Sequence, residues 1–291
     1  MTTQLLPTVP VRTRAHLVLG GLGAAYLVVL TAVYVLTVRT VPGRRVSDAS
    51  LRGALSTQST FSDSVHAVLD VVSVGSLAVA TAAVVVIAML RLAGKAAVVA
   101  IGLLAAANAS TWLLKNYVFQ RPDLGLHEAA PATLNSLPSG HATAAFSAAA
   151  ALVLVVPVAL RAVAAVVGAS VGALVSVATM SAGWHRAGDA LAAFCVVGFW
   201  SVVAAAVVLV RGDHTPAGDR WRPPAHTVRV ALAGLGAGTA ITVLLALVTH
   251  DSTDLPLTVL ALLGGVLLVV GGAFAAMLGV LRAVDLAGTG R

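Results

Sequence analysis

The chain has 291 residues, of which 59% are hydrophobic and 10% are charged, and its formal net charge is +7. Soluble domains are about 45–50% apolar and about 25% charged, so this composition excludes an ordinary water-soluble domain and predicts a membrane protein. The excess of positive charge then indicates cytoplasmic loops rather than a nucleic-acid-binding surface, because Lys and Arg gather in the short cytoplasmic loops of membrane proteins.

A membrane-spanning helix needs about 20 mostly apolar residues, and eight runs of the chain reach that length. In chain order these runs are Ala15–Val38, His66–Leu90, Ala96–Phe119, His141–Leu160, Val163–Ala182, Asp189–Val210, Val230–Val248 and Leu255–Leu281. They predict an all-α membrane bundle of about eight transmembrane helices. The polar stretch Thr40–Asp63, between the first two runs, is expected to be a long outer loop.

The distribution of Lys and Arg predicts how the bundle is oriented. With a cytoplasmic N-terminus, eleven of the 18 basic residues fall in cytoplasmic segments. Both termini are then expected in the cytoplasm, and the richness in Ala and Val favours a bacterial plasma membrane as the location.

The long inner loop Gly212–Thr227 contains three prolines and is the predicted domain boundary. It separates a six-helix core (residues 1–211) from a C-terminal two-helix hairpin (residues 230–291), with residues 212–229 as a cytoplasmic linker. Two glycine pairs within predicted spans are expected to let neighbouring helices approach closely. These pairs are Gly168 with Gly172 and Gly234 with Gly238.

Ionisable residues inside or at the edge of a span are costly, so they are candidates for function. The alternation of the spans places three such groups at the outer face of the membrane. The first group contains Lys115 and Arg121, at the end of the third span. Both are cations able to neutralise phosphate oxygens, Arg121 through a planar bidentate fork. The alternative for this group alone is that both side chains reach the lipid head groups.

The second group is Pro138-Ser139-Gly140-His141, at the start of the fourth span. Free backbone N–H groups and the positive end of the helix dipole attract an anion at such a helix start. Gly140 permits close approach of the backbone, and Ser139 either caps the helix or donates to a phosphate. His141, on the first turn, is placed to give a proton to a leaving group.

The third group is His185 and Asp189, where the fifth span gives way to the sixth. Residues four apart share a helix face, so the carboxylate can bind one imidazole nitrogen and leave the other free to attack. Alone, this pair would be an ordinary interfacial hydrogen bond. The three groups also lack the carboxylates of a dedicated metal site, so we expect chemistry without a metal or another cofactor.

These residues resemble the type 2 phosphatidic acid phosphatase superfamily, which also includes vanadium haloperoxidases. That family carries Lys-x6-Arg-Pro, then Pro-Ser-Gly-His, then Ser-Arg-x5-His-x3-Asp, and the resemblance covers about Ala15–Val210. The chain departs from the pattern in two places. Its first motif is one residue short, and Ala178 and Thr179 stand where the third motif has Ser-Arg. Arg186 is the candidate replacement for the missing arginine.

The resemblance implies a membrane phosphatase that acts on a lipid phosphate or diphosphate. His185 would be the nucleophile that forms a phosphohistidine, Asp189 would orient it, and His141 would be the general acid and base. Other residues would stabilise charge on the phosphate oxygens. These are Lys115, Arg121, Ser139 and Gly140, with Arg186 added as the candidate replacement for the missing arginine.

Three functional hypotheses stay open at this point. The leading one is hydrolysis of a lipid such as a polyprenyl diphosphate, phosphatidylglycerophosphate or phosphatidate at the extracytoplasmic face. The second is transfer of the phosphoryl group to an acceptor other than water. The third is a non-catalytic protein that binds or transports a lipid phosphate. The expected partners are the substrate and membrane lipids, and the sequence does not predict an oligomeric state.

Several weaker features accompany the three groups. His66 and Asp70 are four residues apart and either border the mouth of the site or form a polar pair at the interface. The arginines of the predicted outer loop either attract an anionic head group or a diphosphate, or contact lipid phosphates or solvent, and the second is expected. They are Arg39, Arg44, Arg45 and Arg52. Four tryptophans near span ends are expected to be interfacial anchors. They are Trp112, Trp184, Trp200 and Trp221.

Overall fold

The computed structural model describes residues 11–71, 74–91, 95–129, 135–211, 225–248 and 255–288. In this part of the chain all regular structure is helical. The α-helices are α1 (Val11–Tyr34), α2 (Val41–Val71), α3 (Val74–Arg91), α4 (Lys95–Leu113), α5 (Gly140–Val155), α6 (Val158–Ser181), α7 (Ala187–Arg211), α8 (Ala225–Val248) and α9 (Leu255–Gly288). Two π-helical turns, η1 (Val35–Arg39) and η2 (Leu114–Val118), follow α1 and α4.

Several of these helices are long and apolar enough to cross a membrane. Among the described residues there are five, at Thr13–Arg39, Ala97–Val118, Val158–Ser181, Ala187–Val210 and Pro256–Ala287. Shorter apolar helices lie at Ala78–Leu90, Gly140–Val155 and Val228–Ile241. The prediction of an all-α polytopic membrane bundle is therefore confirmed, while the number of eight crossings stays a prediction.

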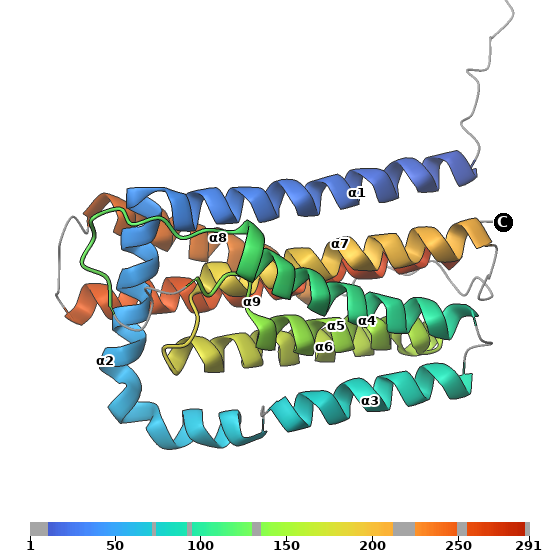
Figure 1. Ribbon diagram of the computed structural model, residues 1–291, viewed down its shortest axis with the longest axis horizontal. Helices are drawn as coiled ribbons and strands as arrows, with labels where there is room; N and C mark the ends of the chain where they lie inside the picture. Colours follow the sequence, from blue (N-terminus) through green and yellow to red (C-terminus); the bar gives the residue numbers. More distant parts are fainter. Residues whose placement is uncertain are drawn as a thin grey trace, which may run out of the picture.

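The segment between the first two predicted spans is a helix. The prediction of an outer loop over Thr40–Asp63 is wrong, because α2 begins at Val41 and continues to Val71. Figure 1 shows α2 crossing the end of the bundle at a steep angle to α1. Its buried side chains include Leu51 and Ala54 but also the charged Arg44 and Asp48. Hydropathy misses this helix because charged residues occupy part of its buried face.

The other helices lie side by side and give the bundle two distinct ends (Figure 1). The start of α1 and the end of α9 lie at one end, and α2 lies across the other. The α6–α7 connection and the segment that follows η2 also lie at the α2 end. The fold therefore brings all three polar groups to the α2 end of the bundle.

Close helix packing fixes the elements that carry these groups. A Cβ atom on Gly172 of α6 would lie 2.6 Å from the Phe146 ring of α5, and one on Gly238 of α8 would lie 2.6 Å from the Leu268 nitrogen of α9. The prediction of close approach at the two glycine pairs is thus confirmed. The Phe146 ring in turn packs on Phe194 of α7, with ring centroids 4.6 Å apart.

The last helix is part of this packed assembly. α9 contacts α2, α6 and α7 as well as α8. The Tyr26 hydroxyl of α1 also donates a hydrogen bond to the Ala276 carbonyl of α9, at 2.7 Å. The division into a six-helix core and a C-terminal hairpin stays a prediction.

Candidate active site

The start of α5 is joined directly to the start of α7. The Ser139 side chain caps α5 by accepting from the Ala142 N–H at 3.3 Å, and its backbone N–H donates to the Asp189 carbonyl at 3.0 Å. The Thr143 hydroxyl donates to the Ser139 carbonyl at 2.8 Å. These bonds hold the Pro-Ser-Gly-His segment against the His-x3-Asp segment.

His185 and Asp189 form the expected pair. Asp189 Oδ2 lies 3.3 Å from His185 Nδ1 and also accepts the Arg186 backbone N–H at 2.9 Å. Both side chains are buried. A carboxylate that faces Nδ1 favours the proton on that nitrogen, which leaves the lone pair of Nε2 available for attack.

His141 faces His185 from the first turn of α5. The two ring centroids are 6.3 Å apart with the planes at 65°, and the centroid of the Trp184 ring lies 5.8 Å from that of His141. His141 and His185 both line a cavity of about 690 Å³. Its lining residues are Ala78, Thr81, Ala82, Asn108, Lys115, Gly140, His141, Ala144 and His185. One cavity therefore brings together residues of all three predicted groups.

The walls of this cavity differ in chemistry. Lys115 lies on the π turn η2, which is closed by the Phe119 N–H donating to the Leu114 carbonyl at 2.7 Å. α3 also lines the cavity and contributes only small side chains, two alanines and Thr81. The lining thus combines ionisable side chains with small uncharged ones.

The two predicted phosphate-binding arginines do not line this cavity. The side chains of Arg121 and Arg186 are each 5% exposed, and both turn to the carboxylate of Glu128. Arg121 Nη2 donates to Glu128 Oε2 at 2.7 Å, and Arg186 Nη2 lies 3.8 Å from the same oxygen. The other oxygen, Oε1, accepts from Arg44 Nε.

Asp48 of α2 continues this ionic network. Asp48 Oδ1 accepts the Ala129 N–H at 2.8 Å and lies 3.9 Å from Arg186 Nη2, while Oδ2 accepts from Arg52 Nε at 2.8 Å. Burial alone would raise the pKa of Glu128, but hydrogen bonds from Arg121 and Arg44 outweigh it and hold that pKa below its ordinary value. Glu128 is therefore a fixed negative charge at neutral pH.

The site of the missing third-motif arginine is closed to solvent. Thr179 is fully buried, and its hydroxyl donates to the Ser176 carbonyl at 3.1 Å. The turn after α6 folds back on this position, because the Trp184 N–H donates to the Thr179 carbonyl at 3.0 Å. Gly183 has a φ of 78°, a conformation that favours glycine. This turn leads from the buried Thr179 to Arg186, whose side chain lies near Asp48 and Glu128.

Residues 96–213 match the family model described as the PAP2 superfamily. This segment is a PAP2 superfamily domain. The match runs from α4 to the end of α7 and contains all three polar groups, so the resemblance seen in the motifs is confirmed over these residues. No curated protein and no solved structure is significantly similar to the chain. Membership of the PAP2 superfamily indicates a membrane-associated phosphatase that acts on phosphate esters.

Two acidic residues beside the PAP2 site, Asp48 and Glu128, were not predicted from the sequence. Glu128 is the only glutamate in the chain, and this was the one feature of the sequence that could have drawn attention to it. Asp48 lies between Arg44 and Arg52 at helical spacings of four, which is a signal of paired charges on one helix face. The expectation that Arg44 contacts lipid or solvent is wrong, because its buried side chain is ion-paired to Glu128. Arg52 is ion-paired to Asp48, and its side chain is also 38% exposed, as expected for contact with solvent.

Two further expectations concern a histidine–aspartate pair and the tryptophans. The side chains of His66 and Asp70, and the whole of Trp221, lie outside the described residues. Trp184 lies against His141 rather than only at an interface. Trp200 donates through Nε1 to the Ser110 hydroxyl at 2.9 Å, which ties α7 to α4.

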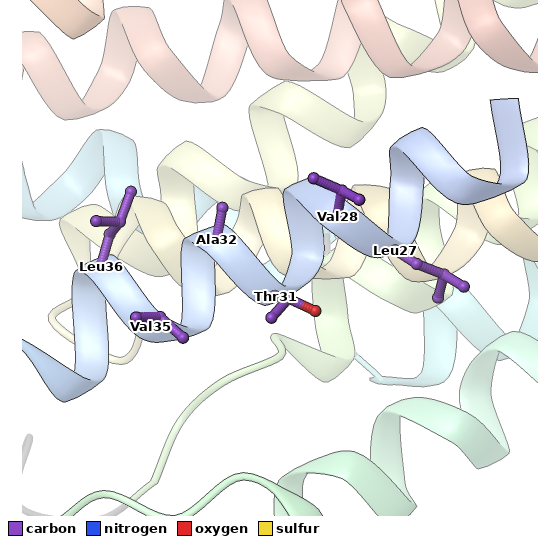
Figure 2. Close-up of a pocket in the computed structure, with 6 residues that line it drawn as sticks. All are labelled: Leu27, Val28, Thr31, Ala32, Val35 and Leu36. Atoms are coloured by element: carbon purple, nitrogen blue, oxygen red, sulfur yellow. The ribbon is translucent and has the colours of Figure 1, made fainter. Parts of the chain in front are cut away.

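A second hollow lies on the outer face of α1 and η1 (Figure 2). Its volume is about 550 Å³. Its six lining residues are Leu27, Val28, Thr31, Ala32, Val35 and Leu36. None of these side chains is ionisable, and Val28 is 67% exposed. This hollow is apolar, whereas the cavity of His141 and His185 is lined by ionisable side chains.

Proposed function

We propose that this PAP2 protein hydrolyses a lipid phosphate or diphosphate through a phosphohistidine intermediate on His185. The observation that carries the proposal is the arrangement of His141 and His185 across one cavity, with Asp189 behind His185 and Lys115 at the rim. A nucleophile, a proton donor and a cation are what transfer of a phosphoryl group requires.

The chemistry proceeds in two steps. In the first step the lone pair of His185 Nε2 attacks phosphorus, the bond to the leaving oxygen breaks, and His141 gives its proton to that oxygen. In the second step His141 takes a proton from water, the resulting hydroxide attacks phosphorus, and the phosphorus–nitrogen bond breaks. His185 is regenerated and inorganic phosphate leaves. Asp189 stabilises the positive charge that the His185 ring carries in the intermediate.

The phosphate oxygens are bound by groups at the starts of the helices. Lys115 and the first turn of α5, with Gly140 exposed at its tip, face the cavity. Arg121 and Arg186, which contact Glu128, are the other cations proposed to bind the phosphate oxygens. Arg186 takes the role of the arginine that is missing at position 179. The Ser139 hydroxyl contributes while it caps α5.

The position of the site favours a lipid substrate. The cavity lies at one end of a bundle whose helices expose apolar side chains to the membrane, such as Leu90 at 81% and Val79 at 69%. Both residues belong to α3, whose small side chains also line the cavity. A head group then binds at the extracytoplasmic face while the tail lies along α3, with both termini in the cytoplasm.

The proposal is tested by phosphate release from a panel of lipid phosphates in the presence of EDTA. The panel contains a polyprenyl diphosphate, phosphatidylglycerophosphate and phosphatidate, each with wild-type protein and His185→Ala. Release that survives chelation and disappears in His185→Ala is the expected result. Equal release from both proteins overturns the histidine mechanism.

Two other outcomes separate the alternative functions. Loss of lipid phosphate without release of inorganic phosphate, dependent on an added alcohol, indicates a phosphotransferase. No turnover of any lipid, combined with saturable binding of the same lipids, indicates a non-catalytic binding protein. A radiolabelled or acid-labile, base-stable phosphoryl group on wild-type protein but not on His185→Ala identifies the intermediate directly.

A further inference from the structure

We propose that Glu128 is a specificity-determining residue. Its carboxylate prevents phosphodiester groups from binding the arginine cluster, but a terminal phosphate can displace it. The arginine cluster is Arg44, Arg121 and Arg186. This inference rests on the proposed function, since it assumes that a phosphate group binds beside His185. It assigns a selectivity to that site which neither the motifs nor the superfamily match contains.

Glu128 holds the position that an anionic ligand of the arginines would take. One oxygen, Oε1, accepts from Arg44, while the other, Oε2, lies 2.7 Å from Arg121 Nη2 and 3.8 Å from Arg186 Nη2. The Glu128 side chain is 6% exposed, so these contacts are shielded from solvent. A phosphate that is to bind Arg121 and Arg186 must compete with this carboxylate.

The cluster retains positive charge beyond what Glu128 neutralises. Among the described residues, the network joins four guanidinium groups to two carboxylates. They are Arg44, Arg52, Arg121 and Arg186, with Asp48 and Glu128. Arg121 Nε is also buried without a hydrogen-bond partner in the described part of the chain. A buried donor of this kind favours an additional acceptor.

The charge of the competing group decides the outcome of the exchange. A phosphodiester carries one negative charge, as Glu128 does, so it gains no electrostatic energy by replacing a carboxylate that is already tethered in place. A terminal phosphate carries a charge of about −1.5 to −2 and three acceptor oxygens, so it can replace the carboxylate favourably. At a membrane surface, phosphodiester head groups greatly outnumber terminal phosphates. Glu128 therefore prevents the abundant phosphodiester head groups from occupying the arginine cluster.

The test measures binding of two small anions to the purified full-length protein in detergent by titration calorimetry. Inorganic phosphate, at mildly alkaline pH where it is mainly the dianion, represents the terminal phosphate, and dimethyl phosphate represents the phosphodiester. In wild-type protein phosphate is expected to bind more tightly. Glu128→Gln is expected to reduce the ratio of the two affinities by roughly tenfold or more, mainly by strengthening dimethyl phosphate binding. An unchanged ratio overturns the inference.

Two controls separate this inference from the proposed function. Asp285→Asn removes a carboxylate from an ion pair with Arg161, far from the cluster, and is expected to leave the ratio unchanged. Arg121→Ala is expected to weaken phosphate binding. If wild-type protein binds phosphate through Arg121 but Glu128→Gln leaves the ratio unchanged, only the inference fails. If wild-type protein does not bind phosphate, the proposed function fails as well.

A second variant covers the case in which Glu128→Gln does not fold. Removal of one carboxylate leaves three buried guanidinium groups with less compensation, which is a strongly destabilising change. The double substitution Glu128→Gln with Arg44→Gln removes one negative and one positive charge, so the net charge of the network is kept. It is expected to reduce the affinity ratio in the same direction as the single variant. An unchanged ratio in a folded double variant overturns the inference.

Discussion

Buried arginines lie at both ends of the helical bundle, but their ionic surroundings differ. At the end away from α2, Arg161 of α6 forms an ion pair with Asp285 of α9, with 3.9 Å between Nη1 and Oδ1. At the α2 end, Arg121 and Arg186 belong to a network in which described guanidinium groups outnumber carboxylates. The first arrangement is a long ion pair between two helices, with Arg282 as a second cation near the Asp285 carboxylate. The second has positive charge in excess, beside a histidine pair.

This difference separates a charge pair that links two helices from a group of charges that attracts a ligand. The Arg161–Asp285 ion pair connects α6 to α9. Excess buried positive charge is costly to fold, so it is expected where binding of an anion offsets the cost. Substitution of a residue proposed to contact the phosphate should therefore alter activity more than stability. Substitution of Arg161 or Asp285, at the other end, should alter stability more than activity.

The largest expected effect is that of Asp189→Asn, which tests whether the α2 end is built for chemistry. The substitution keeps the size of the side chain but removes the charge that faces His185 Nδ1 and accepts the Arg186 N–H. We expect kcat for phosphate release to fall about 10²-fold to 10⁴-fold, because the ring loses its orientation and its compensating charge. KM should change much less. A variant with nearly wild-type kcat would contradict a nucleophilic His185.

Arg186→Ala tests whether this residue serves in place of the arginine missing at position 179. We expect KM for the lipid phosphate to rise about tenfold to a hundredfold, since a charge-assisted contact with the phosphate is lost. Arg186→Lys should recover only part of the loss, because an ammonium group cannot form a bidentate fork. Steady-state kinetics on all three proteins gives the comparison. Equal KM values would show that Arg186 only anchors Asp48 and Glu128.

The cavity could be predicted from the sequence, and the reason is the regularity of membrane helices. Spans of about 20 apolar residues alternate in direction, so the polar ends that carry Lys115, His141 and His185 are bound to meet at one face. The His-x3-Asp spacing likewise predicts the contact of Asp189 with His185. Local periodicity and chain order were sufficient for these residues.

The arginine network could not be predicted in the same way. The contact of Arg44 with Glu128 joins residues 84 positions apart, and no local pattern encodes such a pairing. It also depends on α2, whose buried face carries Arg44 and Asp48 and therefore has the composition of a loop. A charged helix face becomes compatible with burial only when its partners are known, and those partners come from a different segment.

Asp285→Asn tests the end of the bundle away from α2, where Asp285 is ion-paired to Arg161. Removing one partner of a buried ion pair costs about 3–5 kcal/mol, but this pair is long and Asp285 is 16% exposed, so we expect about 1–3 kcal/mol of destabilisation. Denaturation of the detergent-solubilised protein measures this loss. Its kcat/KM should stay within about twofold of wild type, since the pair is distant from the cavity. A large loss of activity at unchanged stability would show that the two ends are coupled.

The smallest expected effect is the pH dependence that Glu128 contributes to stability. Burial opposes its ionisation, but the hydrogen bonds from Arg121 and Arg44 lower its pKa below the ordinary value of 4.5. A carboxyl group with a lowered pKa in the folded state stabilises the protein above its unfolded-state pKa. This contribution is lost as the pH falls through the lower, folded-state value. Wild type should therefore lose Tm below about pH 4.5 more steeply than Glu128→Gln, by a few degrees for each kcal/mol. Parallel Tm curves would mean that Glu128 is not the charge that balances the arginine cluster, and the distinction between the two ends would then rest on the histidine pair alone.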